Sequence, residues 1–268
     1  EGLAANRVER LREEKPRMQL ERLSFDERRD KSLALHGGTL RAALDVAKLD
    51  HSGAIQMPSS TSHVLVEIGC SDRNTMDRDV LPHQPTAFLI SFEPLLDKYA
   101  VLLSRGTTSY HNTTLDMAVP LGAHHQRGVV LPFAVSPKGG PISFHVSSVA
   151  GCSSMMEMNK SSTWAHWCHQ SLETRTVPSL SMVAVLELAG TRPIKVLKLD
   201  AQGADLNLLL SVPPRMLLER VEEIVMEVVA DDCHSLYVGQ PLCSEVLSRM
   251  RSLGFAATFR GVAMNETK

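Results

Sequence analysis

The sequence predicts an α/β fold, an open and mainly parallel sheet with helices on both faces, preceded by an N-terminal helical arm. Two observations predict the sheet. Short apolar segments rich in β-branched residues alternate with helical patterns from residue 63 onward, and several of these segments end on an acid. A third observation, the mixed charge of the first fifty residues, predicts the arm.

The predicted arm differs from the rest of the chain in composition. The stretch ANRVERLREEKPRMQLERLSFDERRDK carries charges of both signs with few apolar positions, and Pro16 interrupts its first helical pattern. Leucine and alanine at helical spacing predict a second helix from Asp26 to about Leu49, followed by the linker HSGAIQMPSS. We therefore expect an arm and linker over residues 1–60 and an α/β domain over 61–268.

Five segments of the predicted domain are apolar at nearly every position, which is typical of strands buried on both faces of a parallel sheet. They are residues 63–69, 86–94, 127–135, 194–200 and 221–229. Helical patterns lie between and after them, at 95–104, 180–189, 204–220 and 241–252. Residues 139–176 break this rhythm with PISFHV, a strand of a predicted hairpin, and a long polar loop of the kind that often serves function or partners.

Composition excludes several function classes. The 268 residues carry 28 Lys and Arg against 30 Asp and Glu, a net charge of -2, so no basic footprint for nucleic acid is expected. No apolar run is long enough to span a bilayer, and no leader is expected at Glu1. Five widely spaced cysteines without a C-x-x-C pair favour a reducing compartment.

The stretch WAHWCHQ has the residue types of a metal site in His166, Cys168 and His169. These residues are too close together to close a tetrahedral site by themselves. The alternative is an exposed loop whose tryptophans pack on the body of the protein or on a partner. We therefore predict no metal site.

Three predicted strands carry an acid at or near their ends, namely Glu67, Glu93 and Asp200. The carboxyl ends of parallel strands share one edge, and Glu93 follows Glu67 by one strand-helix-strand unit, on the neighbouring strand. A carboxylate there can accept hydrogen bonds from both hydroxyls of a ribose. Gly69 permits close backbone approach, but no G-x-G-x-x-G follows it, so a nucleoside without a pyrophosphate fits better.

Asp200 ends the stretch KVLKLDAQGAD, residues 195–205, and two interpretations of it stay open. In the first, Asp200 provides a polar group at the ligand edge, and Gly203 lets the next helix begin close to the sheet. In the second, the Asp200 carboxylate accepts backbone N–H bonds at the start of that helix.

Several motifs in order resemble the FkbM family of S-adenosylmethionine-dependent methyltransferases over roughly residues 60–260. These are VEIGCSDRN, ISFEP, LPFAVSPKGGPISFHV and the K-x-D-x-x-G-x-(acid) run of residues 198–205. The resemblance implies a class I methyltransferase-like (Rossmann-like) domain with a seven-strand-type sheet. It also implies S-adenosylmethionine as cofactor and O-methylation of a hydroxyl on a small molecule or glycan.

The resemblance also assigns roles to residues. Glu67 would hold the loop or the methionine amino group of the cofactor, Glu93 would bind the ribose hydroxyls, and Asp200 would lie near the methionine portion and the acceptor. Residues that would line the cofactor are Gly69, Cys70, Ser71, Phe133, Ala134 and Val135. Because an alcohol must lose a proton, Asp200, His145 or a histidine of 166–169 is a candidate base by residue type.

Two departures from the family pattern favour a rival interpretation. Ser71, Asp72 and Arg73 stand where the family usually has glycine or asparagine-glycine, and Gln202 stands where it usually has glutamate. The rival is a catalytically inactive methyltransferase fold that serves as a structural subunit, with protein partners at residues 1–50 and 151–175. A cavity beside Gly69 would discriminate, because an enzyme keeps it open.

Overall fold

The computed structural model describes residues 46–71, 76–104, 121, 126–149, 151–162, 168 and 171–259. All of these belong to one compact unit, Val46–Lys268, and residues 1–45 of the predicted arm lie outside the described residues. None of the described helices combines the length and apolar character needed to cross a membrane.

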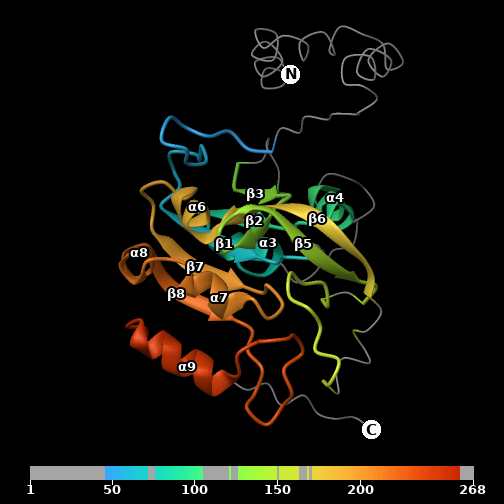
Figure 1. Cartoon of the computed structure of the whole chain (residues 1–268). Helices are drawn as coiled ribbons and strands as arrows, with labels where there is room; N and C mark the ends of the chain where they lie inside the picture. Colours follow the sequence, from blue (N-terminus) through green and yellow to red (C-terminus); the bar gives the residue numbers. More distant parts are fainter. Residues whose placement is uncertain are drawn as a thin grey trace, which may run out of the picture. The chain divides into compact units, whose positions relative to one another are not determined.

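A five-stranded parallel sheet forms the centre of this unit, in the order β3-β2-β1-β7-β8 (Figure 1). Its strands are β1 (His63–Ile68), β2 (Ala87–Phe92), β3 (Gly128–Leu131), β7 (Ile194–Leu199) and β8 (Val221–Met226). This confirms the α/β prediction, although the described residues place five strands in the sheet where a seven-strand type was expected. β1, β2 and β3 are almost wholly buried, because apolar residues occupy both of their faces.

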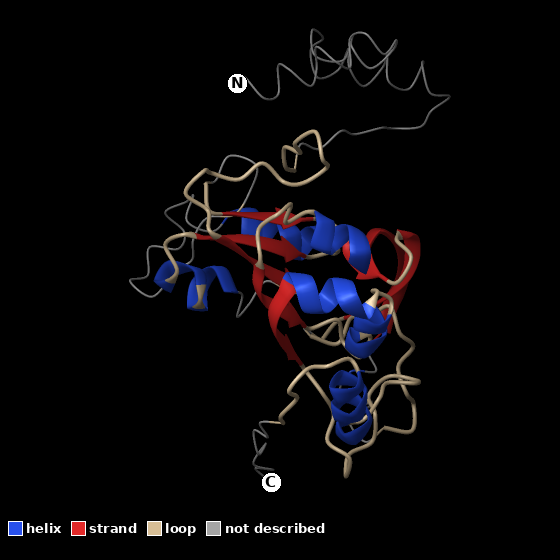
Figure 2. Cartoon of the chain, turned by 90° about the vertical axis from the view of Figure 1, so that its left-hand side faces the viewer, coloured by secondary structure: helices blue, strands red, loops and turns tan. Residues whose placement is uncertain are grey.

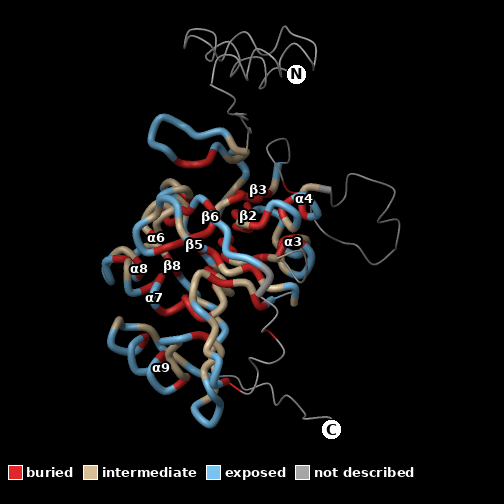
Figure 3. Tube along the Cα trace, turned by 45° about the vertical axis from the view of Figure 1, so that its right-hand side comes forward, coloured by how far each residue is buried: buried red, intermediate tan, exposed pale blue. Residues whose placement is uncertain are grey.

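Helices cover both faces of the sheet, as the alternating pattern predicts (Figure 2). Alternate residues of β1 divide between two apolar clusters, with Val64 and Val66 in one and Leu65 in the other. The Leu65 cluster includes residues of α3 (Met76–Asp79) and α4 (Leu96–Ser104). The Val64 cluster includes residues of α6 (Met182–Glu187), α7 (Asp205–Leu210), α8 (Pro214–Arg220) and α9 (Cys243–Ser252). Figure 3 shows the resulting burial along β2 and β3.

A second sheet of three strands, in the order β4-β6-β5, replaces part of the predicted pattern. It contains β4 (Ala134–Ser136), β5 (Gly140–Ser147) and β6 (Ser171–Ser181). The predicted strand 127–135 is divided at Pro132, which has no N–H to continue the ladder, and the Phe133 N–H turns back to the Leu131 carbonyl at 2.9 Å. β6 is the partner of the predicted hairpin strand and ends where Ser181 caps α6.

Two helix predictions also need correction. The pattern at 204–220 forms two helices, α7 and α8, because Pro213 and Pro214 interrupt it, and Pro214 occupies the first turn of α8. The helix predicted to reach Leu49 has no helical residue from Val46 onward. There the Asp50 carboxylate instead accepts the N–H groups of Ser52, at 2.8 Å, and Ala54, at 3.1 Å, to form a turn.

The predicted linker is part of the folded domain. Ala54 and Ile55 are buried, and the Ile55 N–H bonds to the Leu188 carbonyl at 2.9 Å, just beyond α6. Val46, Ala47 and Met57 also pack against the main apolar cluster. Residues 46–60 therefore contribute to the core of this unit.

Candidate functional site

Three neighbouring strands end side by side at one edge of the main sheet. Glu93 follows β2, Gly69 follows β1 and Asp200 follows β7. Backbone bonds tie the ends together, since the Gly69 N–H bonds to Phe92 at 3.1 Å and the Asp200 N–H bonds to Ile68 at 2.9 Å. The chain passes from β1 to β2 on one side and later to β7 on the other. This edge is therefore a topological switch point, where open α/β sheets bind ligands.

A cleft opens at this edge and encloses roughly 610 Å³ of space outside the protein atoms, including the space at its mouth. Its lining includes apolar and aromatic residues, among them Phe133, Phe144 and Met155. It also includes the acids Glu93 and Asp200 from the strand ends. Further residues that line it are Gly69, Ser71, Leu95, Lys98, Ala134, Val135, Gly151, Ser153, Ala201 and Gln202. An apolar wall with a few convergent polar groups is typical of small-molecule sites.

Gly69 is required by close backbone packing at the end of β1. Its φ is +77°, and an added Cβ would lie 2.0 Å from the carbonyl oxygen of Asp200. The backbone that approaches Gly69 closely is therefore that of Asp200, and the same glycine lines the cleft. Ser71, two residues later, also has a left-handed backbone with φ +53°.

The Glu93 carboxylate is held by backbone groups. The Leu95 N–H donates to Oε1 at 2.9 Å and the Ser71 N–H also bonds to the carboxylate, which is 4% exposed. Burial raises the pKa of Glu93, and these N–H bonds and the Lys98 ammonium partly oppose the rise. Backbone N–H groups therefore hold the Glu93 carboxylate at the cleft.

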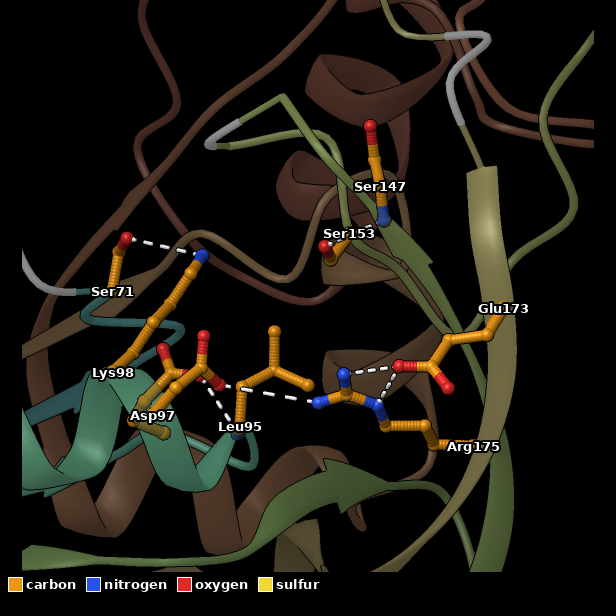
Figure 4. Close-up of polar contacts among 9 residues, drawn as sticks. Ser71, Leu95, Asp97, Lys98, Ser147, Ser153, Glu173 and Arg175 are labelled. Carbon is orange, nitrogen blue, oxygen red and sulfur yellow. Dashed lines mark hydrogen bonds and ion pairs between the residues drawn. The ribbon is translucent and has the colours of Figure 1, made fainter.

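Charged side chains surround the first turn of α4 beside the cleft (Figure 4). Lys98 Nζ donates to Ser71 Oγ at 3.3 Å, which links α4 to the loop after β1. Arg175 of β6 pairs with Glu173 and lies 4.0 Å from Asp97. These contacts bring α4 and the small sheet together next to Glu93.

Asp200 is held by a side chain. Gln202 Nε2 donates to Asp200 Oδ1 at 2.6 Å, and the Tyr237 hydroxyl donates to Gln202 Oε1 at 3.0 Å. Another acid holds the loop before α7, since Asp205, the first residue of the helix, accepts from the Ala201 N–H at 2.9 Å and from the Gly203 N–H at 3.2 Å. The N-cap residue Ala204 has no side-chain cap bond, so the capping role of the second interpretation is not found for Asp200. Burial raises the pKa of Asp205 to about 6, although its N–H bonds act to lower it.

A buried ion pair joins β1 to β7 beneath this edge. Lys198 Nζ lies 2.8 Å from Glu67 Oε1, and the two residues are opposite one another in the strand register. Glu67 Oε2 accepts the Met76 N–H at 2.9 Å, so the carboxylate also anchors the start of α3. Burial raises the pKa of Glu67, whereas for Lys198 burial acts to lower the pKa and the Glu67 charge outweighs it and raises it.

The model of the FkbM methyltransferase domain matches residues 80–256. The chain belongs to the FkbM methyltransferase family. No curated protein and no solved structure matches it. Membership confirms the resemblance to the family and supports a methyltransferase.

Most of the residues assigned by resemblance to the FkbM family lie together at the cleft. Those that line it are Gly69, Ser71, Glu93, Phe133, Ala134, Val135 and Asp200. Glu67 and Cys70 lie behind it: Glu67 bonds to Lys198 and α3, and Cys70 Sγ donates to the Phe92 carbonyl at 3.4 Å within the Leu65 cluster. Burial raises the pKa of the Cys70 thiol well above its usual range, which favours an inert thiol.

His145 is not brought to the cleft. Side chains alternate along β5, and Phe144, the preceding residue, is the one that lines the cleft and packs into the small apolar cluster. His145 lies on the opposite face, where Nδ1 is 3.3 Å from the Thr174 hydroxyl. A role as base therefore lacks geometric support in this FkbM domain.

The structure does not support a metal site in the stretch WAHWCHQ. Cys168 forms a disulfide with Cys152, with the Cα atoms 5.6 Å apart, so its sulfur is not available as a thiolate ligand. His166 and His169 lie outside the described residues. Among the described residues, no group of three or more metal-ligating side chains is placed to hold an ion. A reducing compartment was expected because the cysteines are widely spaced and suggest no disulfide framework. The disulfide between Cys152 and Cys168 does not fit that reason, and the compartment stays a prediction.

Sequence reasoning assigned no role to several residues of the site. Lys98 lies on a correctly predicted helix, but the pattern did not indicate which residue of the helix would reach the cleft. Asp205 had a detectable signal, because an acid in the first turn of a predicted helix is a common cap. Tyr237 had none, since it comes from the loop after β8 and reaches Gln202 through tertiary packing.

Proposed function

We propose that this FkbM domain is an S-adenosylmethionine-dependent O-methyltransferase that acts on a hydroxyl of a small molecule or glycan. The observation that carries the proposal is the open cleft at the ends of β2, β1 and β7, with Glu93 and Asp200 in its lining. Its apolar and aromatic residues provide a surface for a nucleobase, and the fixed Glu93 carboxylate is suited to ribose hydroxyls.

The proposed cofactor supplies an activated methyl group, and the residues of the chain supply position and charge. Glu93 would bind the ribose, and Phe133, Ala134 and Val135 would lie beside the adenine. Asp200 would face the methionine portion and the acceptor hydroxyl, whose proton it could accept. Holding the acceptor in line with the methyl group accounts for much of the acceleration in such a transfer.

The rival function, an inactive structural subunit, predicts a filled or covered pocket beside Gly69. The cleft lined by Gly69 and Ser71 favours the enzyme over this rival. Arg73, which was expected to crowd the cofactor, lies outside the described residues. Ser71 has a left-handed φ of +53°, a conformation that glycine and asparagine, the residues usual in the family at this point, adopt readily.

Calorimetric titration of the full chain with S-adenosylmethionine and S-adenosylhomocysteine tests the proposal. We expect saturable binding of both, followed by transfer of a labelled methyl group to members of a panel of methyl glycosides and hydroxylated polyketides. Absence of binding by a folded sample would overturn the proposal in favour of the structural subunit.

Glu93→Gln tests the site itself. The amide oxygen can still accept the Leu95 N–H, so the loop is retained, whereas the charge that would bind the ribose is lost. We expect S-adenosylhomocysteine affinity to fall by about 30-fold or more. Asp97→Asn is the matched control, because Asp97 is an exposed acid on the first turn of α4 and should leave the affinity unchanged. Equal affinities for wild type and Glu93→Gln would contradict the assignment.

A further inference from the structure

Gln202 lines the cleft and lies at the centre of a hydrogen-bonded network. Its side-chain Nε2 donates to Asp200 Oδ1 at 2.6 Å, and its Oε1 accepts from the Tyr237 hydroxyl at 3.0 Å. Its backbone carbonyl accepts from Ser154 Oγ at 2.7 Å. Side chain and backbone are thus both fixed, and both Gln202 and Asp200 line the cleft.

The chemistry of this network requires an amide. Nε2 lies between two acids, at 2.6 Å from Asp200 and 3.5 Å from Glu227 Oε2, and must donate, whereas Oε1 faces a hydroxyl donor and must accept. A glutamate, the usual residue of the family here, would place a carboxylate against Asp200 with no proton to share at neutral pH. The glutamine therefore replaces repulsion with a charge-assisted hydrogen bond.

Two further features indicate that neighbouring groups hold Gln202 in a conformation that is unfavourable by itself. Gln202 has φ +51°, a left-handed conformation that is unfavourable for a residue with a long side chain. Tyr237 is 1% exposed, and an added Cβ at the neighbouring Gly203 would lie 2.8 Å from its ring. The tyrosine hydroxyl also lies 3.2 Å from the carbonyl of Cys152, at one end of the disulfide, so its own position is constrained.

We propose that Gln202 is a positioning residue that directs the Asp200 carboxylate toward the cationic sulfonium of the cofactor. The inference rests on the proposed function, because it assumes that the cleft binds S-adenosylmethionine. Tyr237 orients the Gln202 amide, the amide holds one oxygen of Asp200, and the negative charge of Asp200 then favours the sulfonium over a neutral thioether. On this proposal, the glutamine at position 202, where the family usually has glutamate, contributes to binding of the cofactor.

The affinity ratio between S-adenosylmethionine and S-adenosylhomocysteine measures this effect directly, because the first carries the sulfonium charge and the second does not. Asp200→Asn should lower the preference for S-adenosylmethionine by about tenfold. Gln202→Asn keeps the amide and suits the left-handed backbone, but is one methylene too short to span Asp200 and Tyr237. We expect it to lower the ratio by about fivefold while the protein stays folded with a modest loss of stability, and Tyr237→Phe to lower the ratio by about twofold.

A double-mutant cycle separates positioning from a general structural effect. If Gln202 acts through Asp200, Gln202→Asn should have no further effect on the ratio in an Asp200→Asn background. Gln56→Asn, the same change at an exposed glutamine, is the control and should leave the ratio unchanged.

Three outcomes are informative. Loss of the ratio in Gln202→Asn that disappears in the Asp200→Asn background supports the inference. Binding of both ligands with an unchanged ratio, or an equal loss for both ligands, overturns the inference and leaves the proposed function standing. Failure of wild type to bind either ligand overturns both.

Discussion

The loops after β1 and β7 meet at the cleft and are built alike, yet they hold their acids differently. Each contains a glycine with positive φ, Gly69 at +77° and Gly203 at +92°, and a non-glycine residue in the same region, Ser71 at +53° and Gln202 at +51°. On the β1 side, the Ser71 N–H bonds to Glu93, the cleft acid at the end of the neighbouring strand β2, and the Leu95 N–H holds the same carboxylate. On the β7 side, the side chain of Gln202 holds Asp200.

The difference separates two ways of building a site. A carboxylate bound by backbone N–H groups is fixed as soon as the loop folds, and changes in nearby side chains affect it little. A carboxylate bound by a side chain depends on every residue that orients that side chain, here Tyr237 as well as Gln202. The β1 side should therefore respond mainly to backbone substitutions, and the β7 side to side-chain substitutions.

The largest expected effect is at the backbone contact that joins the two loops. Gly69→Ala would place a Cβ 2.0 Å from the Asp200 carbonyl oxygen at a φ of +77°, so backbone must move. We expect the free energy of unfolding to fall by at least about 3 kcal/mol, measured by urea denaturation. Gly53→Ala is the matched control, because its φ is +89° but an added Cβ there would have no neighbour within 4 Å.

The control should lose about 1 to 2 kcal/mol, the cost of the left-handed backbone alone. Similar losses of stability for Gly69→Ala and Gly53→Ala would show that the backbone contact between Gly69 and Asp200 is not tight. The two loops would then not be joined by this contact.

The next effect concerns the acid that organises the β7 loop. The pKa of Asp205 rises from 3.8 to about 6 on folding because the side chain is buried. Between these values the folded protein binds more protons than the unfolded chain, so this contribution to stability falls as pH rises and the full penalty is present above about pH 6. The shift corresponds to about 3 kcal/mol.

Asp205→Asn removes this titration. We expect the stability of wild type relative to the variant to fall by up to about 3 kcal/mol between pH 4 and pH 7, measured by urea unfolding at both values. A constant difference across this range would show that the carboxylate is ionised in the fold throughout, held by its bonds from Ala201 and Gly203.

The fold was largely predictable because the central strands carry their signal locally. β1, β2, β7 and β8 lie within the predicted segments, since apolar residues on both faces identify buried parallel strands. The small sheet was not predicted as a separate sheet, because the pairing of β4 with β6 joins residues more than forty positions apart. The role of residues 46–60 depends on the bond from Ile55 to Leu188, which no local pattern records.

The site was predictable to a similar extent. Strand order places Glu93, Gly69 and Asp200 together, and each is visible as a polar or glycine residue at a strand end. His145 has a suitable residue type, but strand alternation turns it away from the cleft. The contribution of Tyr237 was not predictable, because the loop after β8 has no periodicity and its position is set by packing on Gly203.

The smallest expected effect is the sharpest test of the comparison, because it applies one substitution to both loops. Ser71→Gly and Gln202→Gly each relieve a left-handed backbone and each increase the entropy of the unfolded chain. For Ser71 we expect a net gain of about 0.5 kcal/mol, since the backbone N–H that bonds to Glu93 is retained and only the long 3.3 Å bond from Lys98 to the hydroxyl is lost. For Gln202 the same gain is offset by loss of the bonds to Asp200 and Tyr237, and we expect a net loss of about 1 kcal/mol. Urea denaturation of the two variants beside wild type measures both values. Equal gains at the two positions would show that the Gln202 side chain does not stabilise its loop, and opposite signs would show that the backbone fixes the β1 side and a side chain fixes the β7 side.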